Sequence, residues 1–322
     1  MKFFVTGSLG FIGSALIKQL LKDNNDVIGF DLAISNSTLN YKCIKGDIRN
    51  FNFLYESIPN DIDVIIHLAA EHKDEGLSKE DYFSVNVDGT KNLLEVAEKK
   101  KINRLIFFSS SAIYGNNPFP NEVVKPSPLN DYGKSKYKAE MIIEKWVEKE
   151  KNKAIILRPS AVYGPNNKAN IYKFINSVYK NKFLLIGKGE NIKSFIYIKN
   201  LVSATLFTIQ NFDKNLIRYN LVDEPYLTIR EFVDLIRKVC GRKNMGKNIY
   251  LPLFLGVPIV FFIEKLYFFL KITPFINNNK LTKFVSNSKI DGSHIKNKGF
   301  IQSISNQEGI TDTINWIKQD PS

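Results

Sequence analysis

Apolar and polar positions alternate along the first half of the chain in a way that predicts strands and helices in turn. Short β-branched or apolar runs predict strands at Phe3–Thr6, Asp26–Phe30, Tyr41–Lys45, Asp63–His67, Arg104–Phe108 and Lys153–Leu157. Amphipathic stretches between them predict helices at Phe11–Lys22, Tyr82–Lys99 and Tyr132–Glu150. Parallel strands are joined by crossover helices, so this alternation favours a parallel sheet. We therefore expect an α/β fold with a doubly wound parallel sheet over residues 1–163.

Residues 164–322 follow a different pattern, with shorter predicted elements and more polar loops. Neither an internal repeat nor a flexible linker composition separates them from the first half. We expect a smaller C-terminal substrate-binding region that is interleaved with the sheet.

A glycine-rich segment, Gly-Ser-Leu-Gly-Phe-Ile-Gly at residues 7–13, connects the first predicted strand to the first predicted helix. Glycines here let the backbone approach a pyrophosphate, and the helix N-terminus offers free N–H groups to the phosphates. An acidic side chain ending the second strand is placed to accept hydrogen bonds from an adenosine ribose. The residues expected in this dinucleotide site are Gly7, Gly10, Phe11, Ile12, Gly13 and Asp31. The pattern predicts a Rossmann-type sheet.

The residues after Asp31 distinguish between the two common nicotinamide dinucleotides. Leu32, Ala33 and Ile34 are uncharged, so no basic side chain follows Asp31 closely. The 2′-phosphate of NADP would therefore meet a carboxylate without a compensating cation. We expect NAD as the cofactor.

A Tyr-x-x-x-Lys motif, Tyr132 with Lys136, lies in the third predicted helix. The i, i+4 spacing puts phenol and ammonium on one helical face, where the ammonium would lower the phenol pKa from about 10. Tyr132 would then exchange a proton with a substrate hydroxyl. The spacing alone has low specificity, because two other pairs share it, Tyr41 with Lys45 and Tyr267 with Lys271. A family resemblance of the segment before Tyr132, residues 107–115, distinguishes this pair from the other two and is described below.

The order of these motifs resembles the extended short-chain dehydrogenase/reductases of the NAD-dependent epimerase/dehydratase family. The glycine spacing is GxxGxxG, and three further segments match family motifs: Asp47-Ile48, His67-Leu-Ala-Ala70 and Asn86-Val-Asp-Gly-Thr90. The resemblance implies that the cofactor is contacted by Asp47, Ile48, Leu68, Ala69, Ala70, Asn86, Ser109, Tyr132, Lys136 and Pro159.

The segment Phe107-Phe-Ser-Ser-Ser-Ala-Ile-Tyr-Gly115 resembles the family's fifth strand, which carries a third catalytic group. Aligned on Tyr114-Gly115, that hydroxyl falls on Ser110. The resemblance therefore implies Ser110, Tyr132 and Lys136 as the catalytic residues.

The two residues after Ser110 discriminate among the family's reactions. Sugar 4,6-dehydratases carry an Asp-Glu pair there for water elimination, whereas this chain has Ser111 and Ala112. The resemblance thus favours an NAD-dependent sugar C4 epimerase, which acts through a transient 4-keto sugar. Two alternatives stay open: an NAD(P)H-dependent reductase of a 4-keto nucleotide sugar and, more remotely, a non-catalytic Rossmann binding protein.

Candidate substrate contacts follow from the same resemblance. They are Ser111, Arg158, Asn170 and Lys193. Arg158 has an alternative interpretation as a structural ion pair. Lys193 begins a motif in which the family usually has Arg, and a lysine cannot reproduce a bidentate guanidinium contact to a diphosphate.

Several segments, among them His67–Asp74, Asn130–Lys134 and Tyr219–Pro225, resemble a subgroup that makes surface polysaccharides such as O-antigen. That subgroup includes 4-epimerases of N-acetylglucosamine attached to undecaprenyl diphosphate. The expected substrate is a diphosphate-linked hexose or N-acetylhexosamine, with either UDP or undecaprenyl diphosphate as the carrier.

The charge is distributed unevenly along the 322 residues, whose formal net charge is +13. Residues 1–150 carry 19 basic and 21 acidic side chains, net −2, and residues 151–322 carry 26 and 11, net +15. The basic half favours an anionic partner, although 38 of the 45 basic residues are Lys, as codon bias would also give. A diphosphate substrate fits this better than nucleic acid, which we do not expect as a partner.

The aromatic and lysine-containing segment 251–272 is expected to pack in a core or an interface, or to contact a membrane surface. Two cysteines, Cys43 and Cys240, and three scattered histidines predict neither a disulfide framework nor a metal site. The first strand begins without a preceding secretory signal, so we expect a cytoplasmic protein, peripheral on the inner membrane face if the segment binds lipid. The family resemblance implies a homodimer.

Overall fold

The computed structural model describes residues 1–33, 40–73, 76–149, 151–212, 214–241, 250–252, 256, 258, 261, 262, 265 and 284–319. A parallel seven-stranded sheet has the order β10-β6-β5-β4-β1-β2-β3. Its strands are β1 (Lys2–Thr6), β2 (Asp26–Asp31), β3 (Lys42–Lys45), β4 (Val64–His67), β5 (Arg104–Phe108), β6 (Lys153–Pro159) and β10 (Leu216–Leu221). The strand order reverses between β1 and β4, which is where ligands bind in open α/β sheets, beyond the carboxyl ends of the strands.

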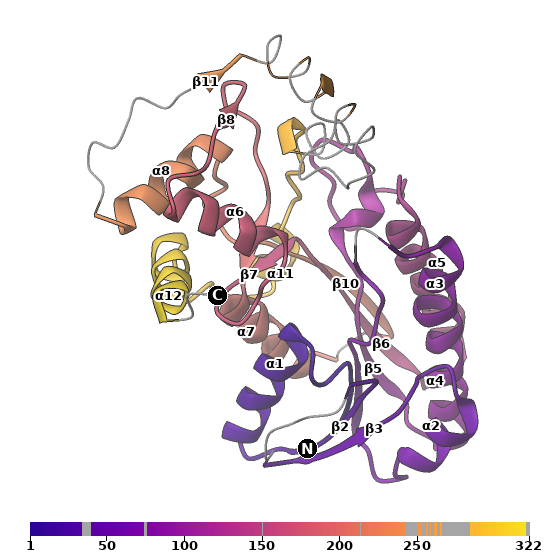
Figure 1. Ribbon diagram of the computed structural model, residues 1–322. Helices are drawn as coiled ribbons and strands as arrows, with labels where there is room; N and C mark the ends of the chain where they lie inside the picture. Colours follow the sequence, from indigo (N-terminus) through magenta and orange to yellow (C-terminus); the bar gives the residue numbers. More distant parts are fainter. Residues whose placement is uncertain are drawn as a thin grey trace. The chain divides into compact units, whose positions relative to one another are not determined.

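Helices cover both faces of this sheet (Figure 1). One face carries α1 (Phe11–Lys22) and α7 (Ile198–Ile209), which pack on each other. The opposite face carries α2 (Phe51–Ser57), α3 (Lys79–Phe83), the π-helical turn η1 (Ser84–Asp88), α4 (Gly89–Lys99) and α5 (Asp131–Val147). A buried apolar cluster joins the strands to α2, α4 and α5, with Phe4, Phe107, Leu93 and Ile143 among its members. A 3-10 turn, η2 (Ser111–Tyr114), follows β5.

The chain is divided into two compact units. Unit 1 comprises residues 1–162, 196–222 and 290–303, and contains the sheet and the short helix α11 (Ser293–Asn297). Unit 2 comprises residues 163–195, 223–289 and 304–322. The second half of the chain therefore returns twice to the sheet unit, once to supply α7 and β10 and once to supply α11.

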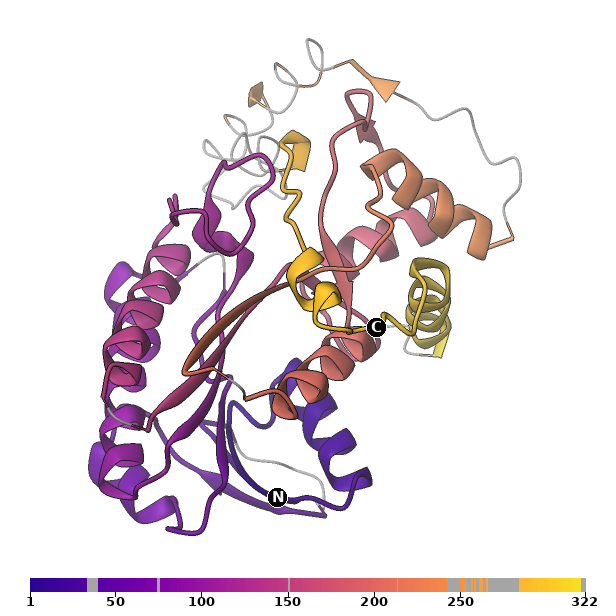
Figure 2. The ribbon, with the colours of Figure 1, turned by 180° about the vertical axis from the view of Figure 1, so that it is seen from behind.

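Unit 2 is built around three helices, α6 (Asn170–Tyr179), α8 (Ile229–Val239) and α12 (Asn306–Gln319). The yellow α12 lies beside the orange α8 in both views (Figure 2), and it also packs on α6. The short strands β8 (Leu185–Ile186) and β11 (Tyr250–Leu251) pair in parallel. A further short pair, β7 (Ala161–Tyr163) and β9 (Phe195–Tyr197), lies where the chain passes from one unit to the other.

All six strands predicted from the sequence are present, with ends that differ by up to two residues. The helix predicted at Tyr82–Lys99 is wrong as a single element, because it is divided into α3, η1 and α4. The helix predicted from Tyr132 is α5, which begins after Asn130, whose side chain accepts a hydrogen bond from the Gly133 N–H at 2.8 Å. None of the helices in the described part of the chain combines the length and hydropathy needed to span a bilayer.

Candidate active site

The glycine loop lies between β1 and α1, at the reversal of strand order. Gly7 has φ of +69°, and a Cβ there would lie 2.7 Å from the backbone nitrogen of Ala69. A Cβ at Gly13 would lie 2.2 Å from the carbonyl oxygen of Gly7. Both contacts are closer than real Cβ atoms allow, so glycine at position 7 lets the loop pack against the residues that follow β4, and glycine at position 13 lets the first turn of α1 pack against the loop.

The N-terminus of α1 is suited to a phosphate. Its N-cap is Gly10, no side chain caps this helix end, and its first turn holds no acidic residue. Phe11 and Ile12, in that turn, are half-buried. The first N–H groups of a helix lack intrahelical partners and carry the positive end of the dipole, so this end favours an anion.

Asp31 ends β2 and ties it to the glycine loop. One carboxylate oxygen accepts the Leu9 N–H and the other the Ala33 N–H, both at 2.9 Å. The side chain is half-buried. These contacts orient the carboxylate beside the loop, as a ribose hydroxyl would require.

Asp47 and Ile48 follow β3, and their side chains are already engaged. The Asp47 carboxylate binds Arg49 with contacts down to 2.6 Å, and those hydrogen bonds lower the pKa of Asp47. Ile48 is buried against Gly89, where a Cβ would lie 2.6 Å from an Ile48 methyl group. Ile48 thus packs α4 onto the sheet, and a contact of either residue with the cofactor stays a prediction.

A closed hydrogen-bond network surrounds His67 at the end of β4. Thr90 donates its hydroxyl to the Asn86 carbonyl (2.7 Å), so it accepts from His67 Nε2 at 3.0 Å. His67 Nδ1 accepts from the Thr6 hydroxyl (2.8 Å), which accepts the Ala69 N–H (3.2 Å). Burial, and secondarily the charge of Lys136, lowers the pKa of His67 to about 3. A neutral His67 therefore helps to hold the backbone of Ala69 through Thr6, and the predicted cofactor-binding residues Leu68, Ala69 and Ala70 are half-buried.

Asn86 lies in η1 and connects this region to α5. Its amide accepts the Glu71 N–H (2.8 Å) and donates to the Glu71 carbonyl (3.0 Å) and the Ser135 hydroxyl (2.9 Å). Ser135 in turn donates to the Tyr132 carbonyl at 2.8 Å. The side chain of Asn86 thus holds α5 in place, and its predicted contact with the cofactor remains a prediction.

Tyr132 and Lys136 lie one turn apart on α5. Tyr132 is half-buried, with its ring 6.3 Å from that of Tyr82. Lys136 is 2% exposed, and its Nζ lies 4.2 Å from the centroid of the Phe107 ring on β5. Burial lowers the pKa of Lys136 to about 7, against an opposing contribution from Glu140. The Lys136 amine therefore lies against β5, near its carboxyl end.

Three serines follow β5, and the structure gives them different environments. Ser110 caps η2, its hydroxyl accepting the Ala112 N–H at 3.1 Å, and both Ser110 and Ser111 are half-buried. Ser109 is 4% exposed, and its hydroxyl has no hydrogen-bond partner within the described residues.

Ser160 directly follows Pro159, the last residue of β6, and its buried hydroxyl also has no hydrogen-bond partner within the described residues. Buried hydroxyls without partners are rare, so two of them at the carboxyl ends of adjacent strands fit a site for a polar ligand such as NAD. The sequence analysis missed Ser160. Its place next to Pro159 was the available signal.

The four candidate substrate residues are divided between the two units. Ser111 and Arg158 belong to unit 1, whereas Asn170 and Lys193 belong to unit 2. Asn170 begins α6 and is exposed, and Lys193 donates to the Ser286 hydroxyl at 3.3 Å. Arg158 is 2% exposed and forms a bidentate ion pair with Glu140. This geometry fits the structural alternative for Arg158 and leaves its guanidinium no exposed face for substrate.

The glycine loop at the switch point, the oriented Asp31 and the Tyr132–Lys136 pair define a nicotinamide-dinucleotide enzyme of the Rossmann type. Within that class the assignment is specific. Residues 3–221 match the model of the NAD dependent epimerase/dehydratase family, and the chain belongs to this family.

Named relatives extend the likeness over the whole chain. Over 316 residues it is 29% identical to the N-acetyl-alpha-D-glucosaminyl-diphospho-ditrans,octacis-undecaprenol 4-epimerase of Escherichia coli O157:H7, covering 96% of this chain and 93% of that protein. The structure of UDP-glucose 4-epimerase from Thermotoga maritima with UDP-glucose matches 100% of both chains with a TM-score of 0.79 and 23% identity. UDP-glucuronic acid 4-epimerase from Bacillus cereus, in complex with NAD, matches 100% of both chains with a TM-score of 0.77 and 24% identity.

The predictions of the family, of a Rossmann-type parallel sheet and of an NAD-dependent enzyme are confirmed. The roles of individual site residues, and the substrate, are taken up as proposals.

Proposed function

We propose that the protein is an NAD-dependent sugar 4-epimerase of surface-polysaccharide biosynthesis, acting on N-acetylglucosamine attached to undecaprenyl diphosphate. The observation that carries this proposal is the geometry of α5 and β5. Tyr132 and Lys136 lie one turn apart, Lys136 is buried against Phe107, and Ser110 begins the turn that follows the same strand. This arrangement supports proton exchange at a sugar hydroxyl beside a bound dinucleotide.

Each of the three residues has a distinct role in this proposal. The Tyr132 phenol takes the proton from the 4-hydroxyl and later returns it to the same oxygen. Ser110 donates a hydrogen bond to that oxygen as it becomes a carbonyl. Lys136 orients the nicotinamide ribose and stabilises the phenolate. The glycine loop, Asp31 and the unpartnered hydroxyls of Ser109 and Ser160 would hold NAD, which supplies the hydride acceptor and donor.

The choice of an epimerase over a dehydratase is supported by Ser111 and Ala112 at the start of η2. Neither side chain can act as the acid or base that water elimination needs. The choice of a lipid carrier is supported by the likeness to the undecaprenol-linked 4-epimerase, which spans both units. In unit 2, burial lowers the pKa of Lys193 to about 8, and a diphosphate next to the amine would favour its charged form.

A comparison of two alternative substrates tests this function. The purified protein is incubated with a catalytic amount of NAD⁺ and either undecaprenyl-diphosphate N-acetylglucosamine or UDP-N-acetylglucosamine. The amino sugars are then hydrolysed from their carriers and separated by chromatography. We expect N-acetylgalactosamine from the lipid-linked sugar, and at least a thousandfold lower rate with Tyr132→Phe, since Tyr132 alone transfers the proton in this scheme. Conversion of only the UDP-sugar would overturn the lipid carrier, and a requirement for stoichiometric NADH would indicate the 4-keto reductase instead.

We further propose a homodimer that lies peripherally on the inner membrane face. Most of segment 251–272 lies outside the described residues. Within it, Phe261 and Phe262 are 52% and 75% exposed, and the exposed Lys265 has its Nζ 5.5 Å from the Phe261 ring centroid. Exposed aromatics beside a lysine support contact with an anionic lipid surface.

A further inference from the structure

A buried guanidinium lies at the carboxyl end of β6. Arg158 is 2% exposed and Glu140, on α5, is fully buried. Arg158 donates from Nε to one Glu140 oxygen at 3.1 Å and from Nη2 to the other at 2.6 Å. A buried ion pair is costly to desolvate and stabilises a fold no better than apolar packing, so its presence calls for another explanation.

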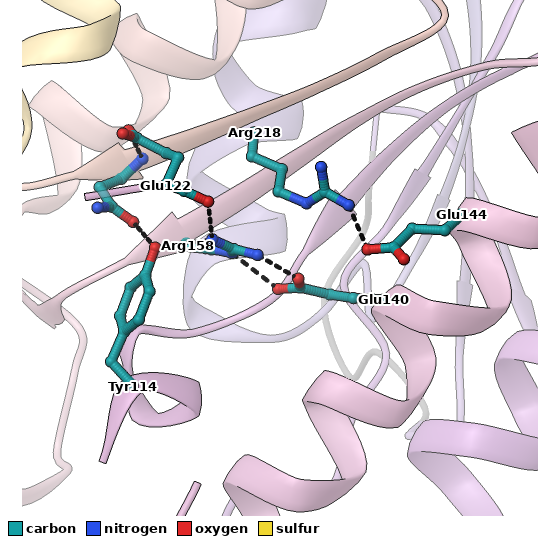
Figure 3. A network of polar contacts seen from close by, with 7 residues as sticks. Tyr114, Glu122, Glu140, Glu144, Arg158 and Arg218 are labelled. Carbon is teal, nitrogen blue, oxygen red and sulfur yellow. Dashed lines mark hydrogen bonds and ion pairs between the residues drawn. The ribbon is translucent and has the colours of Figure 1, made fainter. Parts of the chain in front are cut away.

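The remaining donors of Arg158 reach the turn after β5. Nη1 donates to the Tyr114 hydroxyl at 2.7 Å and to the Glu122 carbonyl at 3.1 Å. Burial raises the pKa of Tyr114 to about 12, so the phenol keeps its proton and donates to Asn220 Oδ1 at 2.7 Å. The Glu122 carboxylate accepts the backbone N–H of Asn220, also at 2.7 Å. Figure 3 shows Arg158 between Tyr114 and Glu140, linking three separate parts of unit 1.

These partners stand next to the proposed catalytic residues in the chain. Tyr114 is the last residue of η2, and Ser110 caps the start of that turn. Glu140 follows Lys136 by one helical turn and Tyr132 by two, on the same face of α5. A polar network with every member partnered is rigid, whereas a network that loses one member leaves a buried charge or dipole unsatisfied.

We propose that Arg158, Glu140 and Tyr114 form a positioning network that fixes η2 against α5 and so sets the Ser110 hydroxyl relative to Tyr132 and Lys136. None of the three touches the reacting atoms in this scheme. This inference rests on the proposed function, because the role of the network is to position residues for that reaction.

A second ion pair on the same helix provides the matched control. Arg218 of β10 pairs with Glu144, one turn beyond Glu140 (Figure 3). Its side chains are 27% and 37% exposed, so water screens the pair and little depends on it. If the two ion pairs, Arg158–Glu140 and Arg218–Glu144, serve stability alone, breaking either one should lower the stability of the fold without lowering kcat.

The first experiment compares Tyr114→Phe with Glu144→Gln in the NAD-loaded protein. Tyr114→Phe keeps the ring and removes only the hydroxyl that links Arg158 to Asn220. We expect kcat per bound NAD to fall roughly ten- to a hundredfold with KM and NAD content unchanged, because small misplacements of reacting groups cost about this much. Glu144→Gln should keep kcat within about twofold of the wild-type value.

The second experiment measures amide hydrogen exchange in peptides covering residues 109–115 and 131–137, without substrate. We expect faster exchange in both peptides for Tyr114→Phe and for Arg158→Lys, which cannot form the bidentate contact, and no change for Glu144→Gln. Because this readout needs no turnover, it stands even if the wild-type protein converts neither sugar. Unchanged exchange in these peptides and unchanged kcat per bound NAD, with only a lower melting temperature, would overturn the proposal.

Discussion

Three buried bases in unit 1 differ in protonation because their partners differ. The His67 ring is hydrogen-bonded to the hydroxyls of Thr6 and Thr90, which satisfy a neutral ring, and burial lowers its pKa to about 3. Burial alone would lower the pKa of Arg158, but the Glu140 carboxylate more than offsets this and keeps Arg158 charged. Lys136 lies between these cases, since burial lowers its pKa to about 7 while Glu140 and the Phe107 ring favour the charged form. Burial of the charged amine of Lys136, the proposed catalytic lysine, thus lowers the free energy of unfolding.

This destabilisation gives a prediction for Lys136→Met in the NAD-free protein. Lys136 titrates near pH 7 when folded and near pH 10.5 when unfolded, so below pH 7 it is charged in both states and its full desolvation cost is present. As pH rises from 7 to 10.5, the folded protein holds this residue neutral and the cost disappears. The shift from 10.5 to about 7 corresponds to about 5 kcal/mol at about 1.4 kcal/mol per pKa unit, and we expect Lys136→Met to raise the free energy of unfolding by an amount of this order below pH 7. The gain should shrink towards pH 10.5.

Urea denaturation at about pH 6.5 and about pH 9.5 measures this difference. His67 stays neutral in the folded protein across this range and does not confound it. A gain from Lys136→Met that is the same at both pH values would show that the Lys136 amine is not desolvated in the folded protein. Loss of sugar conversion in the same variant is expected from the proposed role of Lys136.

At the scale of elements, the sequence predicts what local periodicity encodes and misses what distant partners decide. The six strands and the glycine loop follow from runs of neighbouring residues, and the family resemblance identified Tyr132 and Lys136. The seventh strand, β10, was missed because Arg218 and Asn220 interrupt its apolar pattern. Asn220 is buried there because residues distant in sequence supply its partners, namely Tyr114, Pro120, Glu122 and Asp291. The break at η1 was missed for the same reason, since the Asn86 amide is satisfied by Glu71 and Ser135.

The first turn of α5 gives a prediction for Gly133→Ala. A Cβ there would lie 2.7 Å from the Ala112 carbonyl oxygen in η2, so alanine must push helix and turn apart. In an ordinary helix interior the same change stabilises by about 1 kcal/mol. Here we expect a loss of roughly 1–3 kcal/mol from overpacking, and a lower kcat, because Ser110 and Tyr132 move apart.

Thermal unfolding followed by circular dichroism, together with kcat per bound NAD, checks this effect. Lys138→Ala, at an exposed position of α5, is the control and should change stability by less than about 0.5 kcal/mol. A Gly133→Ala protein that is more stable than the wild type and equally active would show that α5 and η2 need not approach so closely.

At the scale of the whole molecule, the proposed chemistry lies in unit 1, whereas most of the net positive charge lies in unit 2, with +9 against +4. Every residue proposed to bind NAD or to act in catalysis belongs to unit 1, and the excess positive charge lies in the second half of the chain. Unit 2 contains Lys193, Asn170 and the exposed Phe261 and Phe262. This division suits a substrate whose sugar reacts at the sheet while its diphosphate and lipid are anionic and apolar.

The proposed membrane contact can be tested by sedimentation with vesicles of phosphatidylcholine alone or mixed with phosphatidylglycerol. We expect the wild-type protein to pellet with the anionic vesicles and to be partly released by high salt, which screens the lysines and leaves the aromatic contact. Burying each Phe side chain stabilises by about 1.5–3 kcal/mol, so replacing both Phe261 and Phe262 with Glu should weaken binding at least tenfold. Ile301→Glu, which removes an even more exposed apolar side chain from unit 1, should bind like the wild type. Equal binding by all three proteins, or equal loss in both variants, would show that Phe261 and Phe262 do not contact lipid.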